Sequence, residues 1–219
     1  MKTPSKILID RAIATPLAWG ANLGARVLGH ILRRDHAVDP DAVRTIAVAK
    51  LLGMGSIVQA TPMLRDLRRS FSKARIVFVT SQANRGLVDR LPLVDEAIYI
   101  DDSNPTALAA STAKATLELL QRKVDLYFDL EVYSAGASIL SIASGAKNRA
   151  GFYRHSAKFK KGLFTHLSFF NPRIHVSAIY RQLAAAAGAT PDGDVEYGPI
   201  ALRPEDREGL TASLAKHGM

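Results

Sequence analysis

The sequence predicts an α/β fold: a Rossmann-like parallel sheet with helices on both faces. Short apolar runs rich in β-branched residues alternate along the chain with longer segments of helical periodicity. The runs are apolar throughout instead of alternating with polar residues, which is typical of strands buried on both faces of a parallel sheet. With 219 residues, of which 47% are hydrophobic, the chain can bury one such core.

Five strands are expected in order along the chain. They cover residues 45–52, 74–81, 94–101, 124–131 and 147–153. Helices are expected over residues 56–71, 82–91, 105–123, 134–144, 176–187 and 204–218. Residues 153–175 are basic and aromatic without a strand or helix period, so we expect an irregular loop there, either functional or mobile.

The N-terminal segment predicts an amphipathic helix ahead of this domain. Thr15 followed by Pro16 is a favourable helix start, and large apolar residues then recur every four positions. These are Trp19, Leu23, Val27 and Ile31, with Arg26, His30, Arg33 and Arg34 as the basic residues beside them. No secretory cleavage pattern is present, and the uncharged run from Ala12 to Ala25 is too short to cross a bilayer.

Two interpretations of this helix remain open. It lies on a membrane surface, or it docks on its own domain or on a partner, because a hydrophobic stripe looks the same in either setting. The polar, proline-containing stretch that follows is typical of a linker. We therefore expect residues 1–43 to form a helix and linker, and residues 44–219 to form the sheet domain.

Most of the net charge of +9 falls in one segment. No Asp or Glu occurs between Val132 and Pro191. Eight cationic residues lie in that segment: Lys147, Arg149, Arg154, Lys158, Lys160, Lys161, Arg173 and Arg181. This concentration of positive charge favours an anionic partner, such as the phosphates of a nucleotide, a lipid headgroup or a nucleic acid. The simpler alternative is a basic face that only contacts solvent. The chain has no cysteine, which excludes disulfides and thiol chemistry.

Gly53 and Gly55 form a turn between the first strand and a helix. In an open parallel sheet, ligands bind beyond the carboxyl ends of the strands, so this turn can bring backbone N–H groups close to an anion. The two glycines also match the start of the dinucleotide-binding pattern, but Val58 stands at the third glycine position and the second strand ends without a carboxylate. An NADP site using Asn84 and Arg85 is thus the weaker alternative, and the Walker pattern does not occur at this turn.

Several segments, in their order and spacing, resemble the heptosyltransferases of glycosyltransferase family 9, which build the inner core of lipopolysaccharide. The segments are "LGMGSIVQATPMLRDLRRSFSKARIVFVTS" (52–81), "NRGLVDRLPLVDEAIYID" (84–101), "LYFDLEVYSAGASILSIASGAKNRAGF" (126–152), "LFTH" (163–166) and "NPRIHVSAIYRQLAAAAG" (171–188). The resemblance implies a GT-B enzyme with two Rossmann-like domains. The N-terminal domain of such an enzyme receives a lipid-linked acceptor, and the C-terminal domain holds a nucleotide-sugar donor such as ADP-heptose. Only the first domain is matched, so we expect the acceptor-binding half, with the donor domain absent.

The resemblance also identifies candidate catalytic residues. The family pattern places an aspartate directly after the glycine of the turn, where this sequence has Ser56. Inverting sugar transfer needs a general base, and a serine hydroxyl does not serve as one unaided at neutral pH. Ser56 and Glu131 are therefore the catalytic candidates. Glu131, at the end of the fourth strand, is either the replacement base or a structural group, because a carboxylate at that position suits both roles equally. For Asp129, the next carboxylate, we favour a structural role in an ion pair or helix cap.

The remaining candidates are expected to bind the acceptor. Gly53 and Gly55 allow close approach of the backbone, and basic side chains are expected to contact acceptor phosphates. These side chains are Arg154, His155, Lys158, Lys160 and Lys161. The three histidines at positions 155, 166 and 175 fit no compact ligand pattern, so no metal is expected, and no cofactor either.

The resemblance implies an inverting glycosyltransferase that transfers a heptose or related sugar from a nucleotide-sugar donor to a lipid-linked core acceptor. We expect the chain alone to be inactive and to lie in the cytoplasm, at the surface of the inner membrane. One alternative is a non-catalytic module that binds an anionic glycan or lipid, which Ser56 favours. Nucleic acid is not expected as a partner, because the basic segment carries no recognised nucleic-acid-binding signature.

Overall fold

The computed structural model describes residues 7–32, 35–202 and 204–216, and in them a six-stranded parallel sheet. The strands are β1 (Thr45–Ala49), β2 (Arg75–Ser81), β3 (Glu96–Ile100), β4 (Leu126–Asp129), β5 (Asn148–Tyr153) and β6 (His166–Phe169). Their order in the sheet is β3-β2-β1-β4-β5-β6. The predicted fold class, a Rossmann-like parallel sheet with helices, is confirmed.

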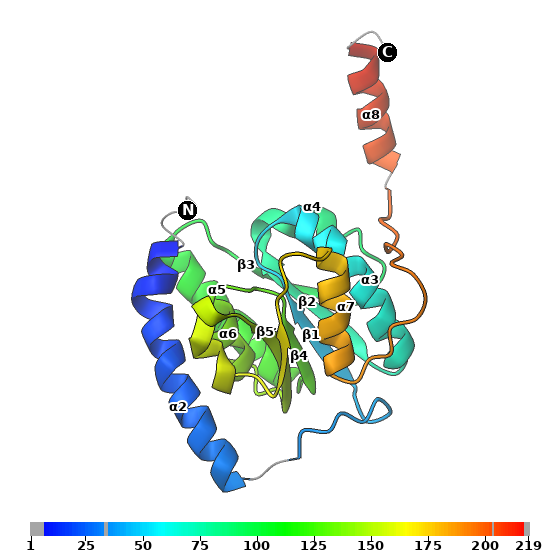
Figure 1. Cartoon of the computed structure of the whole chain (residues 1–219). Helices are drawn as coiled ribbons and strands as arrows, with labels where there is room; N and C mark the ends of the chain where they lie inside the picture. Colours follow the sequence, from blue (N-terminus) through cyan, green and yellow to red (C-terminus); the bar gives the residue numbers. More distant parts are fainter. Residues whose placement is uncertain (1–6, 33–34, 203, 217–219) are drawn as a thin grey trace.

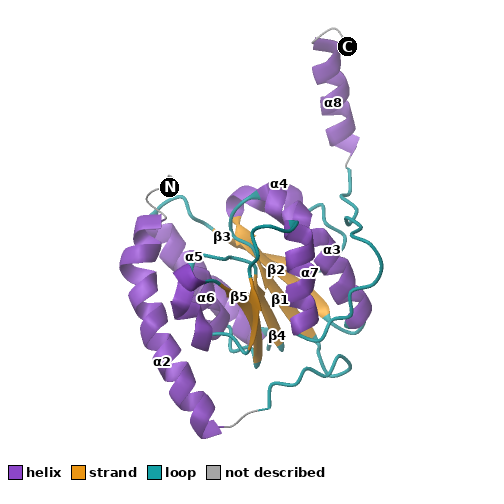
Figure 2. Ribbon diagram, in the orientation of Figure 1, coloured by secondary structure: helices purple, strands orange, loops and turns teal. Residues whose placement is uncertain are grey.

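Helices and helical turns connect the strands. They are η1 (Asp10–Ala14), α2 (Thr15–Leu32), α3 (Met54–Ser70), η2 (Gln82–Asn84), α4 (Arg85–Val88), α5 (Pro105–Gln121), α6 (Ala135–Ala143), η3 (His155–Gly162), α7 (Val176–Ala186) and α8 (Pro204–Lys216). Figure 1 shows α3 and α7 on one side of the sheet and α5 and α6 on the other, and Figure 2 shows the strands between these layers. Each layer has its own buried cluster, because successive strand residues face opposite sides.

The prediction of five strands and an irregular loop over residues 153–175 was wrong in part. The segment forms the 3₁₀ turns of η3 and then β6, which pairs only with β5 at the edge of the sheet. An edge strand of four residues, three of them not buried, lacks the apolar run that identified the other strands. Gly151 of β5 allows this segment to pack closely, since a Cβ there would lie 2.6 Å from the Phe164 ring.

The N-terminal helix α2 lies beside α6 (Figure 1). It packs against α6 and η3 through its small residues. Ala18 is fully buried there, and the Asn22 side-chain amide donates a hydrogen bond to the Phe159 carbonyl. The predicted apolar stripe faces away from the domain, with side chains between 51% and 68% exposed: Trp19, Leu23, Val27 and Ile31. The side chains of Arg26 and His30, and all of Arg33 and Arg34, lie outside the described part of the chain.

The alternative of a helix docked on its own domain is thus correct for one face of α2, while the face with the large apolar residues has no cover within the described chain. None of the described helices is both long enough and apolar enough to cross a bilayer.

After α7 the chain runs back along α3 and α4 before α8 projects away from the sheet (Figure 1). The Gly198 amide donates to the Thr61 hydroxyl at 2.9 Å, and the Ala201 amide to the Arg90 carbonyl at 2.8 Å. These bonds fix the return segment to the layer formed by α3 and α7.

Candidate functional site

The strand order reverses between β1 and β4, which are neighbours in the sheet. Chain connections leave β1 toward β2 and β3 on one side, and β4 toward β5 and β6 on the other. In open α/β sheets this switch point is where ligands bind, in the crevice beyond the carboxyl ends of the two strands. The glycine turn after β1 and Glu131 after β4 therefore meet at the position expected of a ligand site.

Gly53 makes the corner between β1 and α3. Its φ of +87° is a conformation that favours glycine, and its carbonyl accepts hydrogen bonds from the Ser56 and Ile57 amides at 3.0 and 3.2 Å. Leu52 and Met54 on either side are exposed. The corner thus presents the start of α3, with its partial positive charge, to solvent at the mouth of the crevice.

Glu131 holds this corner against β4. Its Oε1 accepts hydrogen bonds from Lys50 Nζ at 2.8 Å, the Leu51 amide at 2.9 Å and the Leu52 amide at 3.0 Å. The residue is only 9% exposed, and Lys50 is also buried. Three donors already occupy this oxygen, and it fixes the path of the chain into the glycine turn.

Asp129 and Lys160 form a second, fully buried ion pair beneath Glu131. Lys160 Nζ lies 3.1 Å from Asp129 Oδ2 and also donates to the Glu131 carbonyl. Burial raises the pKa of Asp129, and the charge of Lys160 offsets part of that rise. Lys160 was predicted to bind acceptor phosphate, but its ammonium is directed inward, and Asp129 has the structural role that the sequence favoured.

Ser56 lies beside Tyr180 of α7. Burial raises the pKa of Tyr180 to about 12, the charge of Glu131 adds to the rise, and a hydrogen bond with Ser56 opposes it. Ser56, Tyr180 and Glu131 are therefore neighbours at the switch point. Neither Tyr180 nor Lys50 was among the residues predicted from the sequence. Tyr180 lies on an apolar helix face, which is typical of a core residue, and the signal available for Lys50 was its position directly after an apolar strand.

The exposed part of the basic segment combines cations with aromatic rings. The Arg154 guanidinium lies 5.6 Å from the ring centroid of Tyr133 and donates to its hydroxyl. Lys161 Nζ lies 5.1 Å from the centroid of Tyr153, whose ring also meets that of His155 edge to face. Arg154, His155 and Lys161 are thus brought together beyond β5, and Lys158 is exposed on the same turn.

Fewer cations of the acid-free segment are free to contribute to a positive surface than the sequence alone suggests. Lys160 pairs with Asp129, and Arg181 pairs with the buried Asp66 at 2.6 Å. Arg149 donates to the carbonyls of residues 146 and 163. Three of the eight cations are therefore engaged internally, two of them by carboxylates outside the segment.

The residues proposed for NADP binding have partners of their own. The Asn84 amide donates to the Leu51 carbonyl at 3.0 Å and to the Thr80 hydroxyl at 2.9 Å. The Arg85 guanidinium lies 4.2 Å from the ring centroid of Tyr99. Among the described residues, no group of three or more potential ligands could hold a metal ion.

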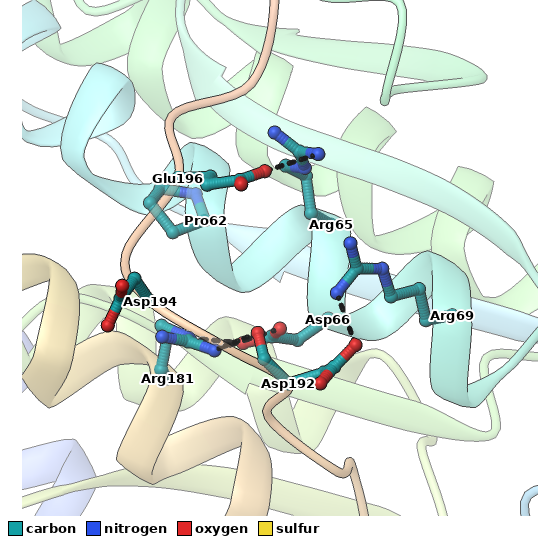
Figure 3. Close-up of a pocket in the computed structure, with 8 residues that line it drawn as sticks. All are labelled: Pro62, Arg65, Asp66, Arg69, Arg181, Asp192, Asp194 and Glu196. Atoms are coloured by element: carbon teal, nitrogen blue, oxygen red, sulfur yellow. Dashed lines mark hydrogen bonds and ion pairs between the residues drawn. The ribbon is translucent and has the colours of Figure 1, made fainter.

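A small hollow lies further along α3, where the return segment after α7 crosses this helix (Figure 3). Its lining residues are Pro62, Arg65, Asp66, Arg69, Arg181, Asp192, Asp194 and Glu196. Ion pairs join three pairs of these side chains: Arg65 with Glu196, Arg69 with Asp192, and Arg181 with Asp66. Two of these ion pairs, Arg65 with Glu196 and Arg69 with Asp192, fasten the return segment to α3.

Solved structures with the same fold identify the architecture. A glycosyltransferase of family 9 from Veillonella parvula matches with a TM-score of 0.70 at 20% identity, over 84% of this chain and 52% of that one. The chain shares its fold with the matched half of a family 9 glycosyltransferase. The E. coli ADP-heptose lipopolysaccharide heptosyltransferase II matches with a TM-score of 0.60 at 16% identity, over 78% and 50% of the two chains. The E. coli heptosyltransferase WaaC, solved with ADP-2-deoxy-2-fluoro heptose, matches with a TM-score of 0.59 at 14% identity, over 70% and 51%.

This chain therefore spans about half the length of each solved structure that it matches. At these identities the similarity establishes the fold, and the resemblance inferred from the sequence is confirmed at that level. Neither the comparison with protein-family models nor that with curated proteins gives a match.

Proposed function

We propose that this chain is the acceptor-binding half of an inverting glycosyltransferase of the lipopolysaccharide heptosyltransferase type. The complete enzyme would transfer a heptose or related sugar from a nucleotide-sugar donor to a lipid-linked core acceptor. The observation that carries the proposal is the switch point, where the glycine turn, Ser56 and Glu131 meet in a fold shared with family 9 enzymes. A structurally similar protein solved with an ADP-heptose analogue supports a nucleotide-sugar donor for the complete enzyme.

The acceptor in this proposal is an anionic saccharide. Tyr133 and Tyr153 offer rings against which sugar faces can pack, and Arg154, Lys161 and His155 beside them can donate to phosphate or carboxylate groups. Lys158 adds charge on the same turn. Lys160 contributes indirectly, because its buried ammonium anchors this turn to Asp129.

For the chemistry, we assign Ser56 to binding the acceptor hydroxyl and keep Glu131 as the candidate base. Both lie near Tyr180, beyond the carboxyl ends of β1 and β4. A general base contributes about 10²–10⁴-fold to turnover. Glu131→Gln in the complete enzyme should therefore lower kcat by at least that order if Glu131 takes the proton, and should mainly raise KM if Glu131 only holds the turn.

A second candidate function is a non-catalytic module that binds an anionic glycan or lipid. The specific observation in its favour is that three donors occupy Oε1 of Glu131 while a serine stands at the position of the family aspartate. The two functions share the binding surface and differ in whether a complete enzyme forms a glycosidic bond.

We further propose that the outward face of α2 places the protein on the cytoplasmic surface of the inner membrane. The exposed apolar stripe of α2 supports membrane binding, because small residues already hold this helix to the domain. The stripe consists of Trp19, Leu23, Val27 and Ile31. An acceptor embedded in that membrane would then lie within reach of the sheet edge.

Binding to the whole chain tests the acceptor assignment. A Kdo-containing inner-core glycan should bind more tightly than duplex DNA at matched salt, and Arg154→Ala should weaken glycan binding by about tenfold, the size expected of one charge-assisted contact. Lys114→Ala, an exposed lysine on α5, is the matched control and should have no effect. Equal affinity for glycan and DNA, or equal losses in both variants, would contradict the assignment.

A further inference from the structure

The N-terminal helical segment contacts the loop between β4 and α6 through Asp10, and the η3 turn through Asn22. We propose that Asp10 is a positioning residue which, together with Asn22, clamps this loop and thereby fixes Glu131 and the glycine turn. The amphipathic helix is then a structural part of the candidate site as well as a surface anchor. The inference uses the proposed function only in taking the glycine turn and Glu131 as the site.

Asp10 forms the first point of the clamp. Its Oδ1 accepts hydrogen bonds from the Ser134 hydroxyl at 3.0 Å and the Gly136 amide at 2.9 Å, and its Oδ2 accepts one from the Ala135 amide at 3.0 Å. The Ala137 amide is capped by Ser134 itself at 3.2 Å. The first three amides of α6 are therefore satisfied, two of them by a carboxylate more than a hundred residues away in sequence. A negative charge at this helix N-terminus is electrostatically favourable.

Asn22, twelve residues further along the N-terminal helical segment, forms the second contact. Its side-chain amide donates to the carbonyl of Phe159, the residue directly before Lys160. Lys160 in turn donates to the Glu131 carbonyl and pairs with Asp129. Asp10 thus holds the end of the loop at Ser134, and Asn22 holds the segment that secures its beginning at Glu131.

The loop transmits this restraint to the glycine turn. Glu131 accepts from the Leu51 and Leu52 amides, which immediately precede Gly53. A contiguous series of hydrogen bonds and buried ion pairs therefore runs from α2 to the corner of β1 and α3. Such a series can carry coupling, whereas a cap alone stabilises only the helix that it caps.

Amide exchange at Leu51 and Leu52 in the whole chain separates these two roles. Asp10→Ala combined with Asn22→Ala should raise both exchange rates by about fivefold, the size expected of a lost cap transmitted to a second segment. Asp10→Asn, which keeps one acceptor oxygen, should give an intermediate rise and serves as the test if the double variant does not fold. Asn104→Ala is the matched control, because Asn104 caps α5 through the Ala107 amide at 2.8 Å without joining distant segments.

The result that overturns the inference is faster exchange at Ala135 and Gly136 with rates at Leu51 and Leu52 unchanged, or an equal response in Asn104→Ala. The outcome is independent of glycan binding. Faster exchange at Leu51 and Leu52 in a protein that binds no glycan would uphold the clamp and contradict the proposed function.

Discussion

Helices α2 and α7 have similar amphipathic patterns, but the large apolar side chains of α7 are buried and those of α2 are exposed. In α7 the large apolar side chains face the sheet, with Ile179 and Leu183 fully buried against the core. In α2 the buried contact is made by Ala18 and its small neighbours, and the large side chains face solvent. Helical periodicity therefore identifies the apolar face of a helix, whereas the rest of the fold determines which residues, if any, cover that face.

The reason lies in what each helix packs against. Small residues let α2 approach α6 and η3 closely, so its contact with the domain needs none of its large side chains. An apolar stripe left outward on such a helix is typical of an interaction surface, because monomeric proteins rarely expose continuous apolar patches without a use. The stripe of α2 is therefore available to a lipid surface, and that of α7 is committed to the core.

Truncating one leucine in each helix should give the largest contrast. Leu183→Ala should lower the free energy of unfolding by about 2–5 kcal/mol, because it leaves a cavity in a packed core. Leu23→Ala should change it by less than about 0.5 kcal/mol, because the side chain is exposed. Urea denaturation of both variants measures the difference, and similar losses would mean that α2 is covered as α7 is.

Titration of Tyr180 should give a smaller effect that reports on the polar end of α7. Its pKa is raised from 10.0 to about 12, so the folded chain holds a proton that the unfolded chain has lost between these values. Stability from this group is complete below pH 10 and declines as the pH rises toward 12. The pKa values of Tyr99 and Tyr127 are also raised, so the spectrophotometric titration is compared with that of Tyr180→Phe, and the difference isolates Tyr180.

Two further variants check the causes of this shift. Glu131→Gln should lower the pKa of Tyr180 by removing a nearby negative charge, and Ser56→Ala should raise it by removing a hydrogen bond. A titration curve that neither variant moves would place Tyr180 away from Ser56 and Glu131.

Local patterns in the sequence predicted most of the sheet and the position of the glycine turn. The strands at the centre were identifiable because burial on both faces gives them continuous apolar runs, whereas β6 at the edge has no such run. Gly53 was found for a physical reason, since the corner after β1 requires a positive φ.

The contacts that define the site could not be predicted, because they join residues far apart in the chain. From the sequence, Lys160 is one of several lysines expected at the surface, but in the fold it pairs with Asp129. In the sequence, Asp10 interrupts an apolar segment, and only the structure shows that it caps α6. Pairings of this kind depend on the assembled sheet and leave no local pattern in composition or spacing.

Fluorescence of Trp19 tests the central claim most directly, since the chain contains only one tryptophan and it lies on the outward face of α2. Anionic vesicles added to the whole chain should shift its emission to shorter wavelength, and Leu23→Glu with Val27→Glu should abolish the shift. Leu117→Glu, at an exposed leucine of α5, should leave the shift intact. Emission that stays unchanged when anionic vesicles are added would contradict a lipid-facing α2.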